Sequence, residues 1–352
     1  MATLTAITSS LIFKIILLII GFVLLIKGAD IFVEGSSSIA KKLKVPPLII
    51  GMTIVAMGTS LPEAAVSVSA SMNNANSLAV SNVVGSNIFN LMMVLGICAL
   101  FNNLSVSKDV LKRDYPFSIF CAILMIFLGV FGLKEDGSYG MNWEIDRLAG
   151  IIYLVLFIGF ITVLIVSAMK ARKRALETGV AAERSLADEM EEEVKDLPVW
   201  KSIIFIIIGM VAIKFGGDWV VDGAVAIAGA LGVSDTIIGL TICAVGTSLP
   251  ELVTSIVAAR KNQLDMAIGN VIGSNIFNIL FVLGIAATIS PIPFAVENII
   301  DICVLLFFSI LIFIFCITKK RINRIEGAIM VVLYVLFMVY VCLRETGVFP
   351  VL

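Results

Sequence analysis

The sequence predicts an all-α integral membrane protein in which ten transmembrane helices form two inverted repeats of five helices each. The first observation behind this prediction is composition: 60% of the 352 residues are hydrophobic, 14% are charged, and the mean hydropathy is +1.09. A soluble domain of this length is much less apolar. The second is a set of ten apolar runs. The third is a pair of polar sequence blocks, each of which recurs 188 residues later.

Each apolar run has about the 20 residues that a helix needs to cross the hydrocarbon core. The first run resembles the core of a signal peptide, but Gly28-Ala29-Asp30 at its end has a counterpart 188 residues later, Gly216-Gly217-Asp218. A removable signal would not share the register of the repeat, so we interpret this run as the first span. The runs lie near 11–33, 46–72, 77–101, 115–133 and 146–169, then near 200–222, 234–259, 265–289, 298–318 and 325–343.

A polar segment separates the fifth run from the sixth. We therefore expect a first five-helix repeat at 1–170, a linker at 171–198 and a second five-helix repeat at 199–352. The linker contains the acidic run Asp188-Glu189-Met190-Glu191-Glu192-Glu193. Because this run lacks the Asp-x-Asp-x-Asp-Gly spacing of a calcium loop, a solvated and partly helical segment is expected.

Lysine and arginine gather in alternate loops, near 41–44, 108–113, 170–201, 260–261 and 319–324. The opposite side has only Lys14, Lys134, Arg147 and Arg344. By the positive-inside rule, we expect a multi-pass protein of the cell (inner) membrane, with the linker in the cytoplasm and both termini outside.

An odd number of spans in each repeat makes the two halves enter the membrane from opposite sides. Loop charge agrees with this inversion: lysines follow the first span at 41–44, whereas the equivalent loop at 223–235 has no lysine or arginine. Many transporters with inverted repeats place a substrate site near the bilayer midplane, where the repeats meet.

The first repeated block places a carboxylate twice where lipid should exclude it. Gly58-Thr59-Ser60-Leu61-Pro62-Glu63 returns letter for letter as Gly246-Thr247-Ser248-Leu249-Pro250-Glu251. Charged residues within spans are costly and usually mark ion or substrate pathways. One such block would be read as a packing kink, but two identical copies in inverted halves indicate a functional role for Glu63 and Glu251.

The prolines in these blocks free backbone oxygens. Pro62 cannot donate to the carbonyl of Gly58, and Pro250 likewise releases the carbonyl of Gly246. In hydrocarbon a freed carbonyl needs another partner, and a bound cation can serve as one.

The second block, Asn82-Val83-Val84-Gly85-Ser86-Asn87-Ile88-Phe89-Asn90, returns at 270–278 with eight of nine residues identical. It opens the third and eighth spans. We therefore predict that broken helices 2, 3, 7 and 8 converge on one ion site at the midplane. For Asn87 and Asn275 we favour interhelical hydrogen bonding, and for Gly51 and Gly239 close packing.

The ligands in the two blocks are all oxygen atoms. The chain has no histidine, and its six cysteines lie in apolar runs without the spacing of a zinc site or a disulfide scaffold. Oxygen ligands suit hard cations such as Na⁺ and Ca²⁺. Two carboxylates neutralise one Ca²⁺ or two Na⁺, so the two loads are electrostatically interchangeable. No prosthetic group, enzymatic reaction or nucleic-acid partner is indicated.

Further carboxylates lie at the ends of the first and sixth spans: Asp30, Glu34, Asp218 and Asp222. They either line an access path or form intrahelical pairs that make charge tolerable near the interface. We favour the pairs, Lys27 with Asp30 and Lys214 with Asp218.

On its Gly-Thr-Ser-Leu-Pro-Glu and Gly-Ser-Asn-Ile-Phe-Asn motifs, the chain resembles the sodium/calcium exchanger branch of the calcium/cation antiporter superfamily, prokaryotic type. The resemblance implies that Glu63 and Glu251 bind Ca²⁺ and also Na⁺, and that the first and sixth spans slide across the core. It implies exchange of three Na⁺ for one Ca²⁺, which is electrogenic. The other implied ligands are the hydroxyls of Thr59, Ser60, Ser86, Thr247, Ser248 and Ser274, the carbonyls of Ala56 and Ala244, and the amides of Asn90 and Asn278.

One departure from the family pattern concerns Asn278, where potassium-dependent relatives have aspartate. An amide at this position argues against K⁺ co-transport. We expect a monomer in the lipid bilayer that exchanges Na⁺ for Ca²⁺ by alternating access. The alternatives are a Ca²⁺/H⁺ antiporter of the same superfamily and a passive cation channel. An intramembrane aspartyl protease built on Asp30 and Asp218 would need a Gly-x-Gly-Asp motif that the chain does not supply.

Overall fold

The computed structural model describes residues 2–73, 77–133, 139–177, 195–233, 238, 241–242 and 244–345. Within these ranges, eight helices are long and apolar enough to cross a membrane, and a ninth span is a bent pair, Pro47–Thr59 with Leu61–Met72. The predicted run at 234–259 is described only in part. The acidic run at 188–193 lies outside the described residues, but the linker begins as a helix, as predicted, because α8 continues to Glu177.

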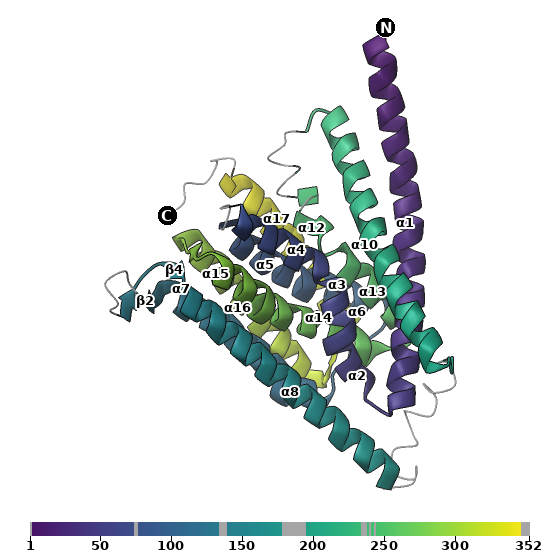
Figure 1. The fold of residues 1–352 in the computed structure, drawn as a ribbon, viewed down its shortest axis with the longest axis vertical. Helices are drawn as coiled ribbons and strands as arrows, with labels where there is room; N and C mark the ends of the chain where they lie inside the picture. The colour runs from purple at the N-terminus through teal and green to yellow at the C-terminus, as the bar shows by residue number, and fades with distance from the viewer. Residues whose placement is uncertain are drawn as a thin grey trace.

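The first repeat is almost entirely helical (Figure 1). Its long helices are joined by short turns, and three π-helical turns, labelled η, interrupt the α-helices. The elements are α1 (Ala2–Leu43), α2 (Pro47–Ile50), η1 (Gly51–Val55), α3 (Ala56–Thr59), α4 (Leu61–Met72), α5 (Ser77–Phe89), η2 (Asn90–Val94), α6 (Leu95–Phe101), η3 (Val110–Asp114), α7 (Tyr115–Val130) and α8 (Arg147–Glu177).

The second repeat has a corresponding series of helices. Short antiparallel strand pairs tie its loops to those of the first repeat: β1 (Leu104–Ser105) pairs with β6 (Arg321–Ile322), and β4 (Glu144–Ile145) with β5 (Ile292–Pro293). A third pair, β2 (Phe131–Leu133) with β3 (Tyr139–Met141), lies within the first repeat. The helices are α10 (Val199–Ala230), α12 (Ala244–Gly246), α13 (Leu249–Arg260), α14 (Leu264–Phe277), η5 (Asn278–Val282), α15 (Leu283–Ile289), α16 (Val296–Lys319) and α17 (Arg324–Glu345).

The third and eighth spans form the centre of the molecule. In each of them 78% of the most apolar stretch of 18 residues is buried inside the protein, against 17% of the corresponding stretch in α1. Their interruption differs in kind from that of the second span, which bends by 47° between α3 and α4. Each remains one span but changes from α-helix to a π-helical turn at its central asparagine, Asn90 or Asn278. Such turns leave the regular hydrogen-bond ladder and occur often at functional sites.

Two long helices, α1 and α10, lie side by side along one flank of this core (Figure 1). Their backbones touch at glycines: a Cβ added at Gly28 would lie 2.8 Å from the Ala212 Cβ, and one added at Gly209 would lie 2.8 Å from the Gly28 carbonyl oxygen. Small residues permit this close approach, which is typical of helix pairs in lipid. The two backbones are therefore in direct contact at these glycines.

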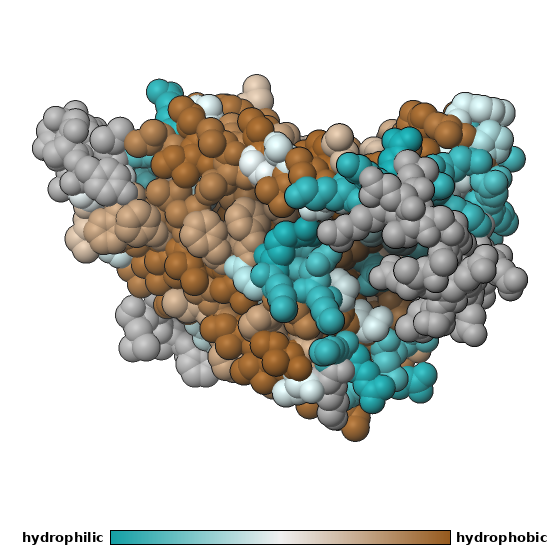
Figure 2. All heavy atoms as spheres, turned by 90° about the horizontal axis from the view of Figure 1, so that it is seen from below, coloured by the Kyte–Doolittle hydropathy of each residue, from teal (hydrophilic) through white to brown (hydrophobic). Residues whose placement is uncertain are grey.

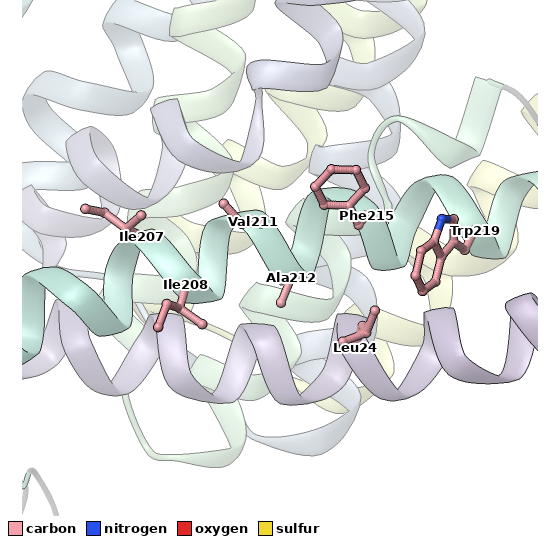
Figure 3. Close-up of a pocket in the computed structure, with 7 residues that line it drawn as sticks. All are labelled: Leu24, Ile207, Ile208, Val211, Ala212, Phe215 and Trp219. Carbon is pink, nitrogen blue, oxygen red and sulfur yellow. The ribbon is translucent and has the colours of Figure 1, made fainter.

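The outer face of this pair is apolar. A shallow groove of about 480 Å³ lies between the two helices. Figure 3 shows its lining residues, of which Leu24 comes from α1. The remaining lining residues come from α10: Ile207, Ile208, Val211, Ala212, Phe215 and Trp219. Seen from below, hydrophobic surface covers much of the molecule and hydrophilic residues gather in one region (Figure 2). This is the surface of a multi-pass membrane protein, whose lipid-facing sides have no need of polar groups.

The ion pairs at the helix ends confirm one expectation and correct another. Lys214 and Asp218 form the predicted pair within α10. The predicted pair of Lys27 with Asp30 is wrong, because Lys261, in the turn after α13, reaches the Asp30 carboxylate at 2.6 Å and its main-chain oxygen at 3.0 Å. A partner from a distant turn offers Asp30 two contacts, which spacing along α1 does not reveal.

The end of the linker is attached to α1. Lys195 Nζ lies 3.1 Å from Glu34 Oε2, and Lys42 Nζ lies 2.6 Å from Asp196 Oδ1. The hydrogen bond from Lys42 and its positive charge lower the pKa of the exposed Asp196 carboxyl below its ordinary value. The structure thus places Glu34 in an ion pair with the linker, which is not the intrahelical pairing considered for these carboxylates.

Candidate ion-binding site

Both glutamates of the repeated block are completely buried in the first turn of a helix, Glu63 in α4 and Glu251 in α13. Each accepts a hydrogen bond from a serine hydroxyl of the opposite repeat. Ser248 Oγ donates to Glu63 Oε1 at 3.1 Å, and Ser60 Oγ donates to Glu251 Oε1 at 2.6 Å. Ser86 Oγ also donates to Glu63 Oε1, at 3.3 Å. The repeats therefore exchange hydrogen bonds at the two carboxylates.

The helix breaks produce this geometry. Ser60 and Ser248 leave the α-helical conformation in the same way, with φ and ψ of −86° and 10° for Ser60 and −94° and 5° for Ser248. Each serine immediately precedes a helix with proline in its first turn, a position where the missing N–H costs nothing. The break turns the serine hydroxyl of each repeat toward the glutamate of the other.

Thr59 and Thr247 occupy equivalent positions with different contacts. The Thr59 hydroxyl has three acceptors within reach: Asn270 Oδ1 and the Val55 carbonyl, both at 3.1 Å, and the Ala56 carbonyl at 3.3 Å. The Ala56 carbonyl also accepts from Ser274 Oγ at 3.5 Å. The Thr247 hydroxyl is buried and has no hydrogen-bond partner among the described residues. Ala244 is the first residue of α12.

A pair of asparagines fixes the glutamate helices, and sequence reasoning did not assign this role. Asn82 Nδ2 donates to Ser67 Oγ at 3.0 Å and to the Glu63 carbonyl at 3.4 Å. Asn270 Nδ2 makes the same two contacts in the second repeat, with Ser255 Oγ at 2.9 Å and the Glu251 carbonyl at 3.4 Å. The sequence does contain a hint of this role, because Ser67 and Ser255, like the two asparagines, are 188 residues apart.

Four further asparagines join the third and eighth spans. Asn87 Nδ2 donates to the Asn275 carbonyl and Asn275 Nδ2 to the Asn87 carbonyl, both at 3.2 Å. Asn90 Nδ2 donates to Asn275 Oδ1 and Asn278 Nδ2 to Asn87 Oδ1, again at 3.2 Å. The predicted interhelical hydrogen bonding of Asn87 and Asn275 is confirmed. Asn278 Nδ2 also approaches Ser86 Oγ at 3.3 Å, which connects this group of amides to Glu63.

Among the buried oxygens without a hydrogen-bond partner in the described residues, four belong to carboxylates or amides: Glu63 Oε2, Glu251 Oε2, Asn90 Oδ1 and Asn278 Oδ1. A buried oxygen without a partner is costly and needs an explanation. All four are acceptors, so a cation can coordinate them whereas an anion cannot. Glu63 and Glu251 are also near enough to interact electrostatically. The donor set, two carboxylates with two amide oxygens and hydroxyls around them, fits a hard cation as substrate.

The comparisons with known proteins agree with this chemistry. A family model described as sodium/calcium exchanger protein matches residues 13–166 and 201–343. The sodium/calcium exchanger MaX1 of Methanosarcina acetivorans is 34% identical over 340 residues, which cover 92% of this chain and 97% of that protein. The inner membrane protein YrbG of Escherichia coli is 36% identical over 305 residues, with coverage of 85% and 87%.

A solved structure also matches over nearly the whole chain. It is that of the sodium-calcium exchanger NCX_Mj soaked with 2.5 mM Na⁺ and 0.1 mM Ca²⁺, with a TM-score of 0.75, 32% sequence identity, and coverage of 92% of this chain and 97% of that one. The fold, the matched family and the whole-length relatives agree. The chain therefore belongs to the sodium/calcium exchanger protein family of membrane cation antiporters.

Proposed function

We propose that this antiporter exchanges Na⁺ for Ca²⁺ at one site formed by Glu63 and Glu251 with the surrounding oxygens. The observation that carries the proposal is the set of four buried, unpartnered oxygens on Glu63, Glu251, Asn90 and Asn278. Membership of the sodium/calcium exchanger family supports the choice of ions. So does the similar NCX_Mj structure, which was soaked with Na⁺ and Ca²⁺.

The other proposed ligands complete the site with hydroxyl and carbonyl oxygens. They are Thr59, Ser60, Ser86, Thr247, Ser248 and Ser274 through their hydroxyls and Ala56 and Ala244 through their carbonyls. Several of these groups touch the glutamates or one another, as Ser248 Oγ does with Ser86 Oγ at 2.9 Å. Flexible oxygen ligands in this number suit Ca²⁺, and Na⁺ accepts the same donors.

Competition between the ions supplies the coupling. Two bare carboxylates in a buried site carry a large desolvation cost, which a bound Ca²⁺ or bound Na⁺ offsets. The loaded protein can therefore change the side to which it opens, and the empty protein cannot. The proposed movement is a slide of α1 and α10 across the core as a pair, since close contacts at glycines join the two helices to each other. Exchange of three Na⁺ for one Ca²⁺ makes the cycle electrogenic, and the neutral Asn278 makes it independent of K⁺.

The proposed topology follows from the charge of the loops. Repeats at 1–170 and 199–352 flank a cytoplasmic linker at 171–198 in the cell membrane, both termini lie outside, and one chain suffices for transport. A cysteine placed at the exposed position Arg172 should then react with a membrane-impermeant thiol reagent only from the cytoplasmic side, and reaction from outside would contradict this orientation.

Ion exchange can be measured in proteoliposomes. Vesicles loaded with Na⁺ should take up labelled Ca²⁺ when diluted into Na⁺-free buffer, and Glu63→Gln or Glu251→Gln should abolish the uptake. Asp222→Asn is the matched control, because Asp222 pairs with Lys14 at the exposed end of α10 and lies outside the site. Uptake driven equally by a pH gradient without Na⁺ would replace this proposal with Ca²⁺/H⁺ exchange, and a K⁺ requirement would contradict the role of Asn278.

A further inference from the structure

The four asparagines between the third and eighth spans have only one consistent orientation. A main-chain carbonyl can only accept, so the Asn87 atom that lies 3.2 Å from the Asn275 carbonyl must be the donor Nδ2. The Asn87 Oδ1 atom then faces Asn278 at 3.2 Å. Since Oδ1 only accepts, the facing atom of Asn278 must be its Nδ2.

The same arrangement recurs with the roles of the two repeats exchanged. The Asn87 carbonyl fixes Asn275 Nδ2, and Asn275 Oδ1 then accepts from Asn90 Nδ2. All four side chains are at most 1% exposed. The orientation of each amide therefore follows from two main-chain carbonyls. Asn90 and Asn278 donate through Nδ2 to Asn275 Oδ1 and Asn87 Oδ1, and their own Oδ1 atoms stay unpartnered among the described residues.

From this geometry we infer that Asn87 and Asn275 are positioning residues that require a neutral amide at positions 278 and 90, respectively, and so limit the charge of the site to its two glutamates. An ionised aspartate at 278 would place a carboxylate oxygen against Asn87 Oδ1, with no proton between two acceptors. Flipping the Asn87 amide would not remove the repulsion, because Asn87 Oδ1 would then face another acceptor, the Asn275 carbonyl oxygen. A protonated aspartic acid could donate, but it would add no charge.

This inference deepens the proposed function and rests on it only for the consequence for ion loading. The pairing itself rests on the hydrogen bonds between the two spans. Asn87 thus determines which side chains position 278 accepts, although it supplies none of the four unpartnered oxygens.

The test is a set of variants of the full chain: Asn278→Asp, Asn87→Ser and the two combined. A serine at 87 removes the fixed acceptor and offers a hydroxyl that can donate. We expect Asn278→Asp alone to lower the unfolding temperature in detergent with chelator present, and to reduce Na⁺-driven Ca²⁺ uptake about tenfold, as expected for a buried charge facing an acceptor. In the combined variant both quantities should return to the values of Asn87→Ser alone.

A matched control changes the other central amide. Asn275→Ser should not rescue Asn278→Asp, because Asn275 pairs with Asn90, but it should rescue Asn90→Asp. Asn87→Ala serves as a second variant if Asn87→Ser does not fold. Equal rescue by Asn87→Ser and Asn275→Ser, or an Asn278→Asp protein as stable and active as the unaltered chain, would overturn the inference. Absence of Na⁺-driven uptake in the unaltered chain would refute the proposed function, while the unfolding temperatures would still decide the pairing.

Discussion

The glutamates of the site are held by residues from the opposite repeat. Ser60 donates to Glu251, and Ser248 donates to Glu63. Sequence reasoning predicted both glutamates and both serines, because exact repetition of a costly carboxylate within a span has few structural explanations. It did not predict which serine meets which glutamate, since contacts between residues 191 and 185 positions apart depend on how the spans cross. The same holds for Lys261, which took the place of Lys27 beside Asp30.

We predict that Ser60→Ala weakens Ca²⁺ binding. The substitution removes the hydroxyl that lies 2.6 Å from Glu251 Oε1, and a hydrogen bond to a charged group contributes about 1.5–3 kcal/mol. The Ca²⁺ concentration for half-maximal uptake should therefore rise by about tenfold or more. Thr162→Val is the control, because the exposed Thr162 hydroxyl donates to the Ile158 carbonyl of its own turn of α8. An unchanged half-saturation in Ser60→Ala would exclude Ser60 from the site.

Helix type and position could be predicted from the sequence, but helix irregularity could be predicted only where proline causes it. Apolar runs of membrane-spanning length gave the spans, and Pro62 marked the bend between α3 and α4. The π-helical turns at Asn90 and Asn278 have no comparable signal, because nothing in the residue pattern specifies a hydrogen bond to the fifth preceding residue. The glycine contact of α1 with α10 likewise required both helices in place.

For these elements we predict that Gly216→Ala impairs the protein. A Cβ at Gly216 would lie 2.6 Å from the Leu25 nitrogen and 2.8 Å from the Gly21 carbonyl oxygen, so the α1 and α10 backbones would have to separate. Overpacking of this kind costs about 1–3 kcal/mol. We expect a lower unfolding temperature and slower exchange.

Gly159→Ala is the control for this variant. Gly159 is exposed on α8, and a Cβ there meets no described atom within 4 Å. Alanine also favours a helix over glycine by about 1 kcal/mol, so stability should be unchanged or slightly increased. Equal effects of the two substitutions would show that close α1–α10 contact is unimportant.

For the whole molecule, the inverted repeat is what assembles one site from two halves that are each incomplete. Each repeat contributes one buried glutamate, one serine at a helix break and one amide at a π-helical turn. The constant offset in the sequence and the odd number of predicted spans were sufficient to predict this arrangement. The unpartnered oxygens could not be predicted, because a residue list does not show which atoms remain after all other hydrogen bonds have formed.

Competition of Na⁺ with Ca²⁺ for the purified protein tests the central claim most directly. Equilibrium binding of labelled Ca²⁺ should be displaced by Na⁺ with a Hill coefficient above one, should be insensitive to K⁺ at equal ionic strength, and should be absent from Glu63→Gln and Glu251→Gln. Ca²⁺ binding that persists in both glutamine variants, or that Na⁺ does not displace, would contradict a shared site at Glu63 and Glu251.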